Sequence, residues 1–390
     1  MPAPLRHLRV IEFSHMVMGP SMGLILGDLG ADVIKVEPLG GDKTRQLRGS
    51  GAGYFAMYNR NKRSIAVDLK HADGRAVVER LVRPADVLLE NFRDGTMDRL
   101  GFGYAPMREL NERLIYCSAR GFLKGPYAHR TALDEVAQMM GGLAYMTGPP
   151  GRPLRAGASV IDVAGGMFGV VAILAALEER HRTGSGQHVS SALYESTAFF
   201  VGQHMAQHAV TGTPAQPMPV RLSAWAIYDI FETADDERVF VGVVSDSQWR
   251  AFCEHFELAE FAARAEFASN SGRVAARDEI LPAVQRVFAA LPHDELLARL
   301  ERCGLPFAPI TRPHDLFDDP HLNAAGGLVP VTIPDGAATK LPALPISFDG
   351  ERCSQQHDLP SPGANTDEVL SEFDYADDEI AQLRADGVVA

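Results

Sequence analysis

Apolar residues gather in short continuous runs along the first third of the chain, and helical patterns separate several of these runs. Continuous apolar runs are typical of strands that are covered on both faces of a parallel sheet. Their alternation with helices predicts right-handed βαβ units and an α/β fold. The predicted strands are 8–13, 31–37, 63–69, 85–92 and 114–122, and the predicted helices between them are 19–30 and 73–82.

Three longer helical patterns follow, over 134–146, from Asp162 to about His181, and over 193–209. The segment TGTPAQPMP (211–219) is rich in Pro and Thr and is typical of a linker. Beyond it, AWAIYDIFET and RVFVGVV flank the polar turn ADDE and predict an antiparallel hairpin, with helical segments after it. We therefore expect the N-terminal part of a large domain over 1–210, a linker over 211–222, a smaller α+β domain over 223–315, and a further segment over 316–390.

Composition and charge narrow the classes of function. A length of 390 residues favours two domains. A net charge of −13 argues against nucleic acid or an anionic membrane as the main partner. The four cysteines form no CxxC pair, which is typical of reduced thiols in the cytosol. The N-terminus has no signal-peptide pattern and no run reaches 18 apolar residues, so we expect a cytoplasmic protein.

Nucleotide binding is tested by the turn after the first predicted strand. That turn, HMVMGPSMG, lacks the G-x-G-x-x-G pattern, although Glu37 stands where a ribose-binding acid would lie. Arg60, Lys62 and Arg63 cluster before the third strand, either as a solvated loop or as a grip on phosphate. Asn91, Arg93 and Arg99 follow the fourth strand and strengthen the second interpretation.

The histidines and serines indicate neither a metal site nor a serine hydrolase. His204 and His208 are four residues apart on a predicted helix, but the segment HMAQH lacks the glutamate of a zinc-binding HExxH. The chain also contains no GxSxG. We therefore expect no metal cofactor.

Asp162 is the one carboxylate in GASVIDVAGG (157–166) and precedes an apolar helical run. It can be the N-cap of that helix, because aspartate is a favoured N-cap residue. It can also act chemically, because a helix N-terminus stabilises negative charge on a carboxylate or on an oxyanion beside it. The glycines around it would allow a bulky ligand to approach the backbone. Capping and catalysis are compatible.

Several stretches together resemble the class III coenzyme A transferase family (CaiB/BaiF type), which includes formyl-CoA transferase and the α-methylacyl-CoA racemases. They occur in the family's order along nearly the whole chain. The matching stretches are VIEFSHMVMGP (10–20), LGADVIKVEPLGGD (29–42), NRNKRSIAVDLK (59–70), ADVLLENFRDGTMDRLGFGY (85–104), DEVAQMMGG (134–142), GASVIDVAGGMFGVVAILAALEERHRTGSGQHV (157–189) and PGANTDEVL (362–370).

The resemblance implies that Asp162 is the nucleophile. In the family, this aspartate attacks the acyl-CoA thioester to form an acyl-aspartyl anhydride, which the CoA thiolate converts into an aspartyl-CoA thioester. Such covalent catalysis divides the exchange of two acids into accessible steps. Coenzyme A and acyl-CoA enter as substrates, and no permanently bound cofactor is implied.

The resemblance also implies a set of coenzyme A contacts. One arginine expected after the second strand is replaced by Pro38, so neighbouring cations would carry more of the phosphate charge. The contacts fall on His15, Val17, Met18, Arg63, Val67, Asp68, Leu69, Lys70, Asn91, Phe92, Arg93, Arg99 and Leu133.

Leu133 separates two branches of the family. The racemases place a histidine there, directly before the acid that begins the next helix, and use it as a second acid/base. Leucine transfers no proton, and His129 lies four residues earlier, so transferase is favoured over racemase. A non-catalytic CoA-binding protein is a third reading.

The acceptor acid and the assembly are also expected from the resemblance. PMPVRLSAW (217–225) lacks the glycine run that covers the site in formyl-CoA transferases, which disfavours oxalate. Arg155 and Arg221 are either surface residues or partners for the distal carboxylate of a dicarboxylic acid. We expect a succinyl-CoA-type donor and a C4–C5 acceptor such as itaconate, mesaconate or malate. The implied fold is a Rossmann-like large domain, to which residues 316–390 return through a second linker, in an interlocked homodimer.

Overall fold

The computed structural model describes residues 2–221, 223–333, 336–353 and 355–390. Two compact units are present, one formed by Met1–Pro219 with Pro320–Ala390 and the other by Val220–Asp319. The predicted linker over 211–222 and the predicted segment over 316–390 include positions 222, 334–335 and 354, which lie outside the described residues.

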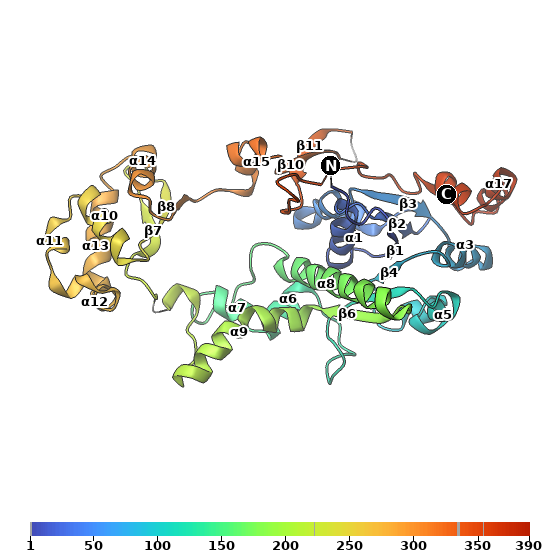
Figure 1. Ribbon diagram of the computed structural model, residues 1–390, viewed down its shortest axis with the longest axis horizontal. Helices are drawn as coiled ribbons and strands as arrows, with labels where there is room; N and C mark the ends of the chain where they lie inside the picture. Colours follow the sequence, from blue (N-terminus) through green and yellow to red (C-terminus); the bar gives the residue numbers. More distant parts are fainter. Residues whose placement is uncertain (1, 222, 334–335, 354) are drawn as a thin grey trace. The chain divides into compact units, whose positions relative to one another are not determined.

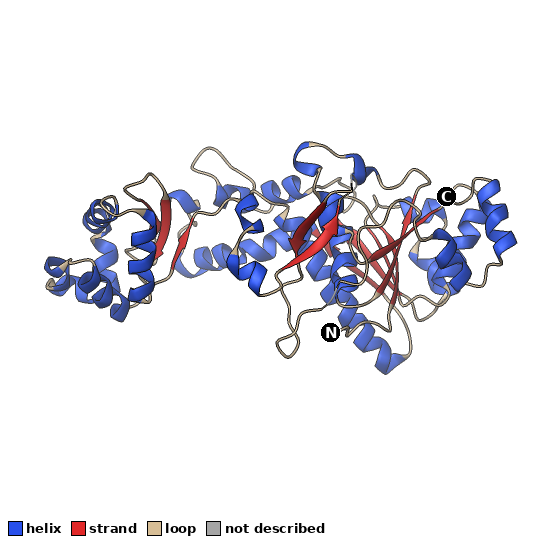
Figure 2. Ribbon diagram, turned by 90° about the horizontal axis from the view of Figure 1, so that it is seen from above, coloured by secondary structure: helices blue, strands red, loops and turns tan. Residues whose placement is uncertain are grey.

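The first unit contains a six-stranded sheet with the order β3-β2-β1-β4-β5-β6, in which neighbouring strands are parallel (Figure 2). This confirms the predicted α/β fold. The strand order changes direction between β1 and β4. The sequence did not predict β6, because HVSSA has no apolar run. The strands are β1 (Arg9–Phe13), β2 (Asp32–Glu37), β3 (Lys62–Ala66), β4 (Val87–Glu90), β5 (Ile115–Arg120) and β6 (His188–Ala192).

The helices predicted over 19–30, 73–82, 193–209 and from Asp162 to about His181 are present, several short helices were not predicted, and one prediction needs correction. The helix expected over 134–146 is two helices, because Gly142 adopts a left-handed conformation (φ 85°) that favours glycine. The bounds are α1 (Met18–Asp28), α2 (Tyr54–Tyr58), α3 (Ala72–Val82), α4 (Thr96–Leu100), α5 (Tyr104–Leu110), α6 (Asp134–Met140), α7 (Leu143–Thr147), α8 (Val160–Thr183), α9 (Leu193–Thr211), α15 (Pro320–Ala324), α16 (Thr366–Glu372) and α17 (Asp377–Ala385), with a two-stranded sheet of β10 (Leu328–Thr332) and β11 (Ala338–Pro342).

Helices cover both faces of the sheet. Val10 belongs to an apolar layer that also contains residues of α1 and α8, whereas Ile11 belongs to the opposite layer, with residues of α3, α16 and α17. This alternation follows from the pleat of the strand. Because each face is covered, the strands appear in the sequence as continuous apolar runs.

Close packing of α1 against α8 depends on glycine (Figure 1). A Cβ at Gly166 would lie 2.1 Å from Ser21 Oγ and 3.0 Å from the carbonyl oxygen of Met18. At Gly165 it would lie 2.6 Å from Met18 Cε. These two glycines therefore bring two helices together, and the prediction that they provide room for a ligand is wrong for them. By contrast, a Cβ at Gly157 would meet nothing within 4 Å.

By length and composition alone, α8 is the one helix in the described ranges that could cross a membrane. Half of its most apolar window is buried within the protein. Burial of that kind is usual for a core helix, so the finding is weak evidence for a membrane span.

The C-terminal segment packs on β3. The Ser64 N–H donates to Asn365 Oδ1 at 3.0 Å, and the Asp68 N–H donates to the Val388 carbonyl at 2.8 Å. At the other end of this segment, the Ala390 N–H donates to the Ala66 carbonyl at 3.1 Å. Residues from both ends of the chain thus complete one unit.

The second unit contains the predicted hairpin, formed by β7 and β8, and a third antiparallel strand, β9. Its core is rich in aromatic side chains such as Trp249, Phe252 and Phe288. The elements are β7 (Tyr228–Glu232), β8 (Arg238–Gly242), α10 (Asp246–His255), α11 (Ala259–Ala262), α12 (Asn270–Ala275), α13 (Arg277–Phe288), α14 (His293–Cys303) and β9 (Phe307–Pro309).

Candidate active site

The switch in strand order brings two predicted contact residues together. His15 follows β1 and Asn91 follows β4, and these two strands are neighbours. The Asn91 side chain accepts from the His15 N–H at 3.0 Å and donates to the His15 carbonyl at 2.8 Å. The Phe92 ring lies 5.5 Å from the His15 ring. In open α/β sheets, ligands bind in the crevice at this point, beyond the carboxyl ends of the strands.

The neighbouring predicted contacts, Val17 and Met18, are buried, with 1% and 4% of their surface exposed. The Met18 side chain packs in the core layer that contains α8. The predicted contacts with coenzyme A at these positions therefore stay predictions, and they would involve backbone atoms because both side chains are buried. Met16 between them and His15 has φ 63°, and its N–H donates to Thr44 Oγ1 at 2.9 Å.

The predicted contacts after β3 differ in exposure. Val67 is buried and forms a bridge with Val389, so its side chain is also turned into the protein. Asp68 and Leu69 are half-buried and Lys70 is exposed. The Lys70 N–H donates to Asp68 Oδ1 at 2.9 Å. Only the last three remain open to a ligand through their side chains.

Arg93 and Arg99 are exposed beyond β4. Arg99 Nη2 donates to Thr96 Oγ1 at 2.9 Å. Arg93 borders a cavity of about 290 Å³ that lies beyond the ends of β4 and β5. His129 and Arg130 line the same cavity, and its wall reaches Ala132, the residue before Leu133.

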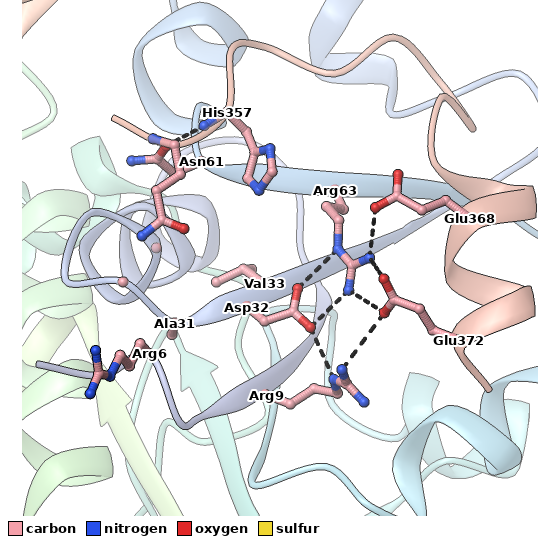
Figure 3. Close-up of a pocket in the computed structure, with 13 residues that line it drawn as sticks. Arg6, Arg9, Ala31, Asp32, Val33, Asn61, Arg63, His357, Glu368 and Glu372 are labelled. Atoms are coloured by element: carbon pink, nitrogen blue, oxygen red, sulfur yellow. Dashed lines mark hydrogen bonds and ion pairs between the residues drawn. The ribbon is translucent and has the colours of Figure 1, made fainter. Parts of the chain in front are cut away.

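Arg63 is not available to a phosphate, and its predicted contact with coenzyme A is corrected. Arg63 lies near the amino end of β3, whereas His15 and Asn91 follow the carboxyl ends of β1 and β4. It therefore lines a different pocket (Figure 3). Its guanidinium is 2.8 Å from Asp32, 3.1 Å from Glu368 and 2.7 Å from Glu372. These carboxylates hold the pKa of Arg63 above its usual range despite burial.

The other cations of the same cluster are also internal. Arg60 pairs with Asp28 at 2.6 Å, and Lys62 pairs with Glu12 at 2.8 Å. All four side chains are buried. Both interpretations of the cluster, the solvated loop and the phosphate grip, are therefore wrong.

The carboxylate of Glu37 is also bound by other residues of the protein. It is buried and pairs with Arg45 at 2.6 Å, and it accepts from Ser64 Oγ at 2.6 Å. A ribose-binding role for Glu37 is therefore not supported.

Asp162 is the third residue of α8, because the helix begins at Val160 and its N-cap is Ser159. The N-cap interpretation of Asp162 is therefore wrong. Asp134 performs the capping from outside the helix, since its Oδ2 accepts from the N–H groups of Ile161 at 2.9 Å and of Asp162 at 3.2 Å. These amides are satisfied by Asp134, which leaves them unavailable to an oxyanion.

Asp134 is 3% exposed, and its Oδ1 accepts from Gln138 Nε2 at 2.5 Å. A buried negative charge therefore lies beside Asp162. Burial first, and then the charges of Asp134 and Glu135, raise the pKa of Asp162 to about 7, while Arg155 lowers it. Strongly perturbed carboxyl groups of this kind are concentrated at functional sites.

The short helix α2 lies near the start of α8. Tyr54 Oη is 3.5 Å from Ser159 Oγ. Burial first, and then the charge of Asp162, raise the pKa of Tyr58. The sequence did not indicate this pair of tyrosines, because YFAMY is too short to show a helical period. Asp134 was noted only as a helix start.

Arg155 and Leu133 lie near Asp134. The Arg155 guanidinium pairs with Glu135 and is 3.5 Å from Asp134. The arrangement supports a role in holding the loop before α8 more than the predicted contact with a substrate carboxylate. Leu133 is the N-cap of α6 and 56% exposed, so it presents an apolar surface and no proton donor. Arg221 lies in the second unit and stays a prediction.

The parallel sheet, with its change of strand order between β1 and β4, defines an open α/β class of protein. Within that class, the chain belongs to CoA-transferase family III, whose model matches residues 5–366. This confirms the resemblance, and the chain is a CoA-transferase of that family. Acyl-CoA thioesters and carboxylic acids are the substrates of such enzymes.

Relatives of known name and a solved structure agree with this family assignment. The chain is 35% identical to the succinate–glutarate CoA-transferase of Agrobacterium fabrum, over 95% of this chain and 96% of the relative. It is 34% identical to the succinyl-CoA:mesaconate CoA-transferase of Haloarcula marismortui, over 92% of each. The crystal structure of a CaiB/BaiF family protein from Brucella suis matches with a TM-score of 0.83 at 33% identity, over 96% of this chain and all of that one.

Proposed function

We propose that the protein transfers coenzyme A from a succinyl-CoA-type donor to a C4–C5 dicarboxylic acid, with Asp162 as the nucleophile. The observation that carries the assignment is the half-buried Asp162 carboxyl at the start of α8, whose pKa is raised to about 7. A carboxylate of raised basicity is a better nucleophile towards a thioester carbonyl than an ordinary aspartate. The open space beside Gly157 supports access of a substrate to the same helix end.

The proposed reaction consists of two half-reactions, each with two steps. The Asp162 carboxylate attacks the thioester carbon, the carbon–sulfur bond breaks, and CoA thiolate leaves an acyl-aspartyl anhydride. The thiolate attacks the aspartyl carbonyl, which releases the donor acid and leaves an aspartyl-CoA thioester. The acceptor carboxylate then repeats these two steps in reverse and leaves as the new CoA ester. The thioester bond energy is conserved throughout.

The names of the relatives support the choice of acids, since one acts on succinate and glutarate and the other on succinyl-CoA and mesaconate. Itaconate, mesaconate and malate are the acceptors expected from the sequence, and glutarate joins them. Racemisation is disfavoured by Leu133, which stands at the position of the second acid/base.

Mass spectrometry of the protein after incubation with succinyl-CoA tests the proposal. We expect an adduct of coenzyme A on the peptide that contains Asp162, and its loss on addition of an acceptor acid. Transfer to a panel of C4–C5 dicarboxylates and to monocarboxylates of equal length then identifies the acceptor. α-Proton exchange of a 2-methylacyl-CoA in deuterated water without any adduct would support the racemase, and binding without either would indicate a non-catalytic protein.

We also propose that the chain forms a homodimer, and the interlocked arrangement stays a prediction from the family. The support is an apolar face on two packed helices, α8 and α9. Val171 on α8 is 61% exposed and Phe199 on α9 is 71% exposed. Exposed apolar surface on this scale is typical of an interface. Further exposed apolar residues on the same helices are Met167, Leu174, Phe200, Met205 and Val210.

The substitution Val171→Glu is expected to shift the protein from dimer to monomer, because a charge would be buried without a partner. Light scattering after size-exclusion chromatography measures the mass. Glu178→Gln, an exposed site later on the same helix, is the control and should leave the dimer intact. A wild-type protein of 42.3 kDa in solution would contradict the proposal.

A further inference from the structure

The ends of β4 and β5 carry a buried ion pair outside the reacting groups. Glu90 is the last residue of β4 and Arg120 the last of β5. Arg120 Nη2 is 2.6 Å from Glu90 Oε1, and the Glu90 side chain is fully buried. Arg120 Nη2 also donates to Ser118 Oγ at 3.0 Å, which fixes the guanidinium on its own strand.

This pair holds both backbone polar groups of Phe92. The Phe92 N–H donates to Glu90 Oε2 at 3.0 Å, and the Phe92 carbonyl accepts from Arg120 Nη1 at 3.0 Å. Phe92 in turn packs on His15, whose backbone is held by Asn91. The shape of the turn at the strand switch point therefore depends on this ion pair.

The same arginine forms part of the cavity beyond these strands. Arg120 lines it together with Arg93, Arg130 and His129, and the one carboxylate in its wall is Asp94. The cavity is therefore cationic, and its lining includes the turn and Ala132, which precedes Asp134 by two residues in the chain. An elongated anion such as an acyl-CoA matches this charge.

We propose that Glu90 and Arg120 are positioning residues, which preorganise the turn over 91–93 for acyl-CoA and thereby determine its affinity without taking part in the transfer. The proposal rests on the proposed function, because acyl-CoA is the ligand. Replacing a buried ion pair with uncharged groups of similar size is often tolerated by the fold. The pair can therefore be removed as a unit, while the turn loses its anchor.

The double substitution Glu90→Met with Arg120→Met tests the proposal without leaving a buried unpaired charge, and neither new side chain can replace the hydrogen bonds to the Phe92 backbone. Freeing two or three residues of the turn is expected to weaken coenzyme A binding by about 10- to 100-fold. We expect the KM for acyl-CoA to rise by the same factor, and kcat to stay within about threefold of the wild type. Titration calorimetry with coenzyme A and steady-state kinetics measure these values.

Arg180→Met is the matched control, because Arg180 on α8 binds residues that precede the amino ends of β4 and β5. Arg180 is also buried, pairs with Asp86 at 2.8 Å and donates to the Arg113 carbonyl at 3.1 Å. Its removal should lower the unfolding temperature but leave the KM for acyl-CoA unchanged. Arg120→Lys, which restores a cation beside Glu90, should recover part of the lost affinity if the anchor acts through its charge.

Wild-type affinity for coenzyme A in the double variant would overturn the positioning role alone. An equal loss of affinity in the double variant and in Arg180→Met would also overturn it, because the effect would then follow stability. A parallel loss of kcat without a change in KM would do the same. Failure of the proposed function is distinguishable, since it would appear in the wild-type protein as absence of transfer and of the Asp162 adduct.

Discussion

Asp162→Asn is expected to stop CoA transfer and to make the protein more stable at pH 8. Folding raises the pKa of this carboxyl from 3.8 to about 7. A raised carboxyl pKa means that the folded state binds the proton more tightly than the unfolded state. The stability of the wild type should therefore fall as the pH rises from about 4 to about 7, and then stay level. The amide of asparagine carries no charge, so the stability of the variant does not fall with pH through this group.

The gain at pH 8 is at most about 4 kcal/mol, because each pKa unit corresponds to about 1.36 kcal/mol. The unfolding temperatures of variant and wild type should differ at pH 8 and converge towards pH 4, at equal protein concentration. Glu109→Gln, an exposed carboxylate on α5, is the control and should change neither stability nor transfer. An equal unfolding temperature at pH 8 would show that the carboxyl is not destabilised by its surroundings.

The activity of the wild type should follow the same ionisation. Only the carboxylate form attacks the thioester, so kcat/KM should rise with pH and level off above about 7. The profile of kcat/KM reports groups of the free enzyme. Transfer by Asp162→Asn above about a thousandth of the wild-type rate would contradict the role of nucleophile.

Arg63→Met is expected to destabilise the first unit strongly without weakening acyl-CoA binding. Arg63 joins Asp32 on β2 to Glu368 and Glu372 on α16 (Figure 3). Its removal leaves Arg9, which pairs with Asp32 at 2.9 Å and lies 3.7 Å from Glu372, as the remaining cation beside these three carboxylates. Loss of one partner from a buried ion pair costs about 3–5 kcal/mol. The lower end applies here, because the acids are partly exposed.

Urea unfolding of the variant measures the loss of stability, and the KM for acyl-CoA measures the effect on binding. Arg6→Met, which lies in the same pocket, is the matched control and should cost less than about 0.5 kcal/mol. Arg63→Lys should recover only part of the stability, because an ammonium cannot span the same set of carboxylates in a fork. A tenfold rise in KM with unchanged stability would restore Arg63 as a phosphate contact.

The sheet was the most predictable part of the protein. Strands such as 8–13 and 114–122 are covered on both faces, so their apolar character is evident without any knowledge of neighbours. β6 was missed because HVSSA combines a half-exposed edge strand with small polar residues. The break at Gly142 was missed because two adjacent glycines do not by themselves reveal which one takes a left-handed conformation.

The site was predictable only in part, because charge partners are distant in sequence. Arg63 resembles a free cation until Glu372, some 300 residues later, is placed beside it. Asp134 acts on Asp162 through a contact across 28 residues. Local patterns identify the groups that carry charge, whereas the fold decides which of them neutralise one another. The remaining contacts after β3 and β4 stay predictions.

The glycine-mediated contact between α1 and α8 has a consequence for the position of Asp162 relative to His15. α1 starts directly after the turn that contains His15, and α8 starts with the segment that contains Asp162. Because a larger residue at Gly166 would clash with Ser21 and Met18, the close approach of the two helices depends on this glycine. A side chain at Gly166 would push the two helices apart, so it is expected to alter the position of Asp162 relative to the turn that contains His15.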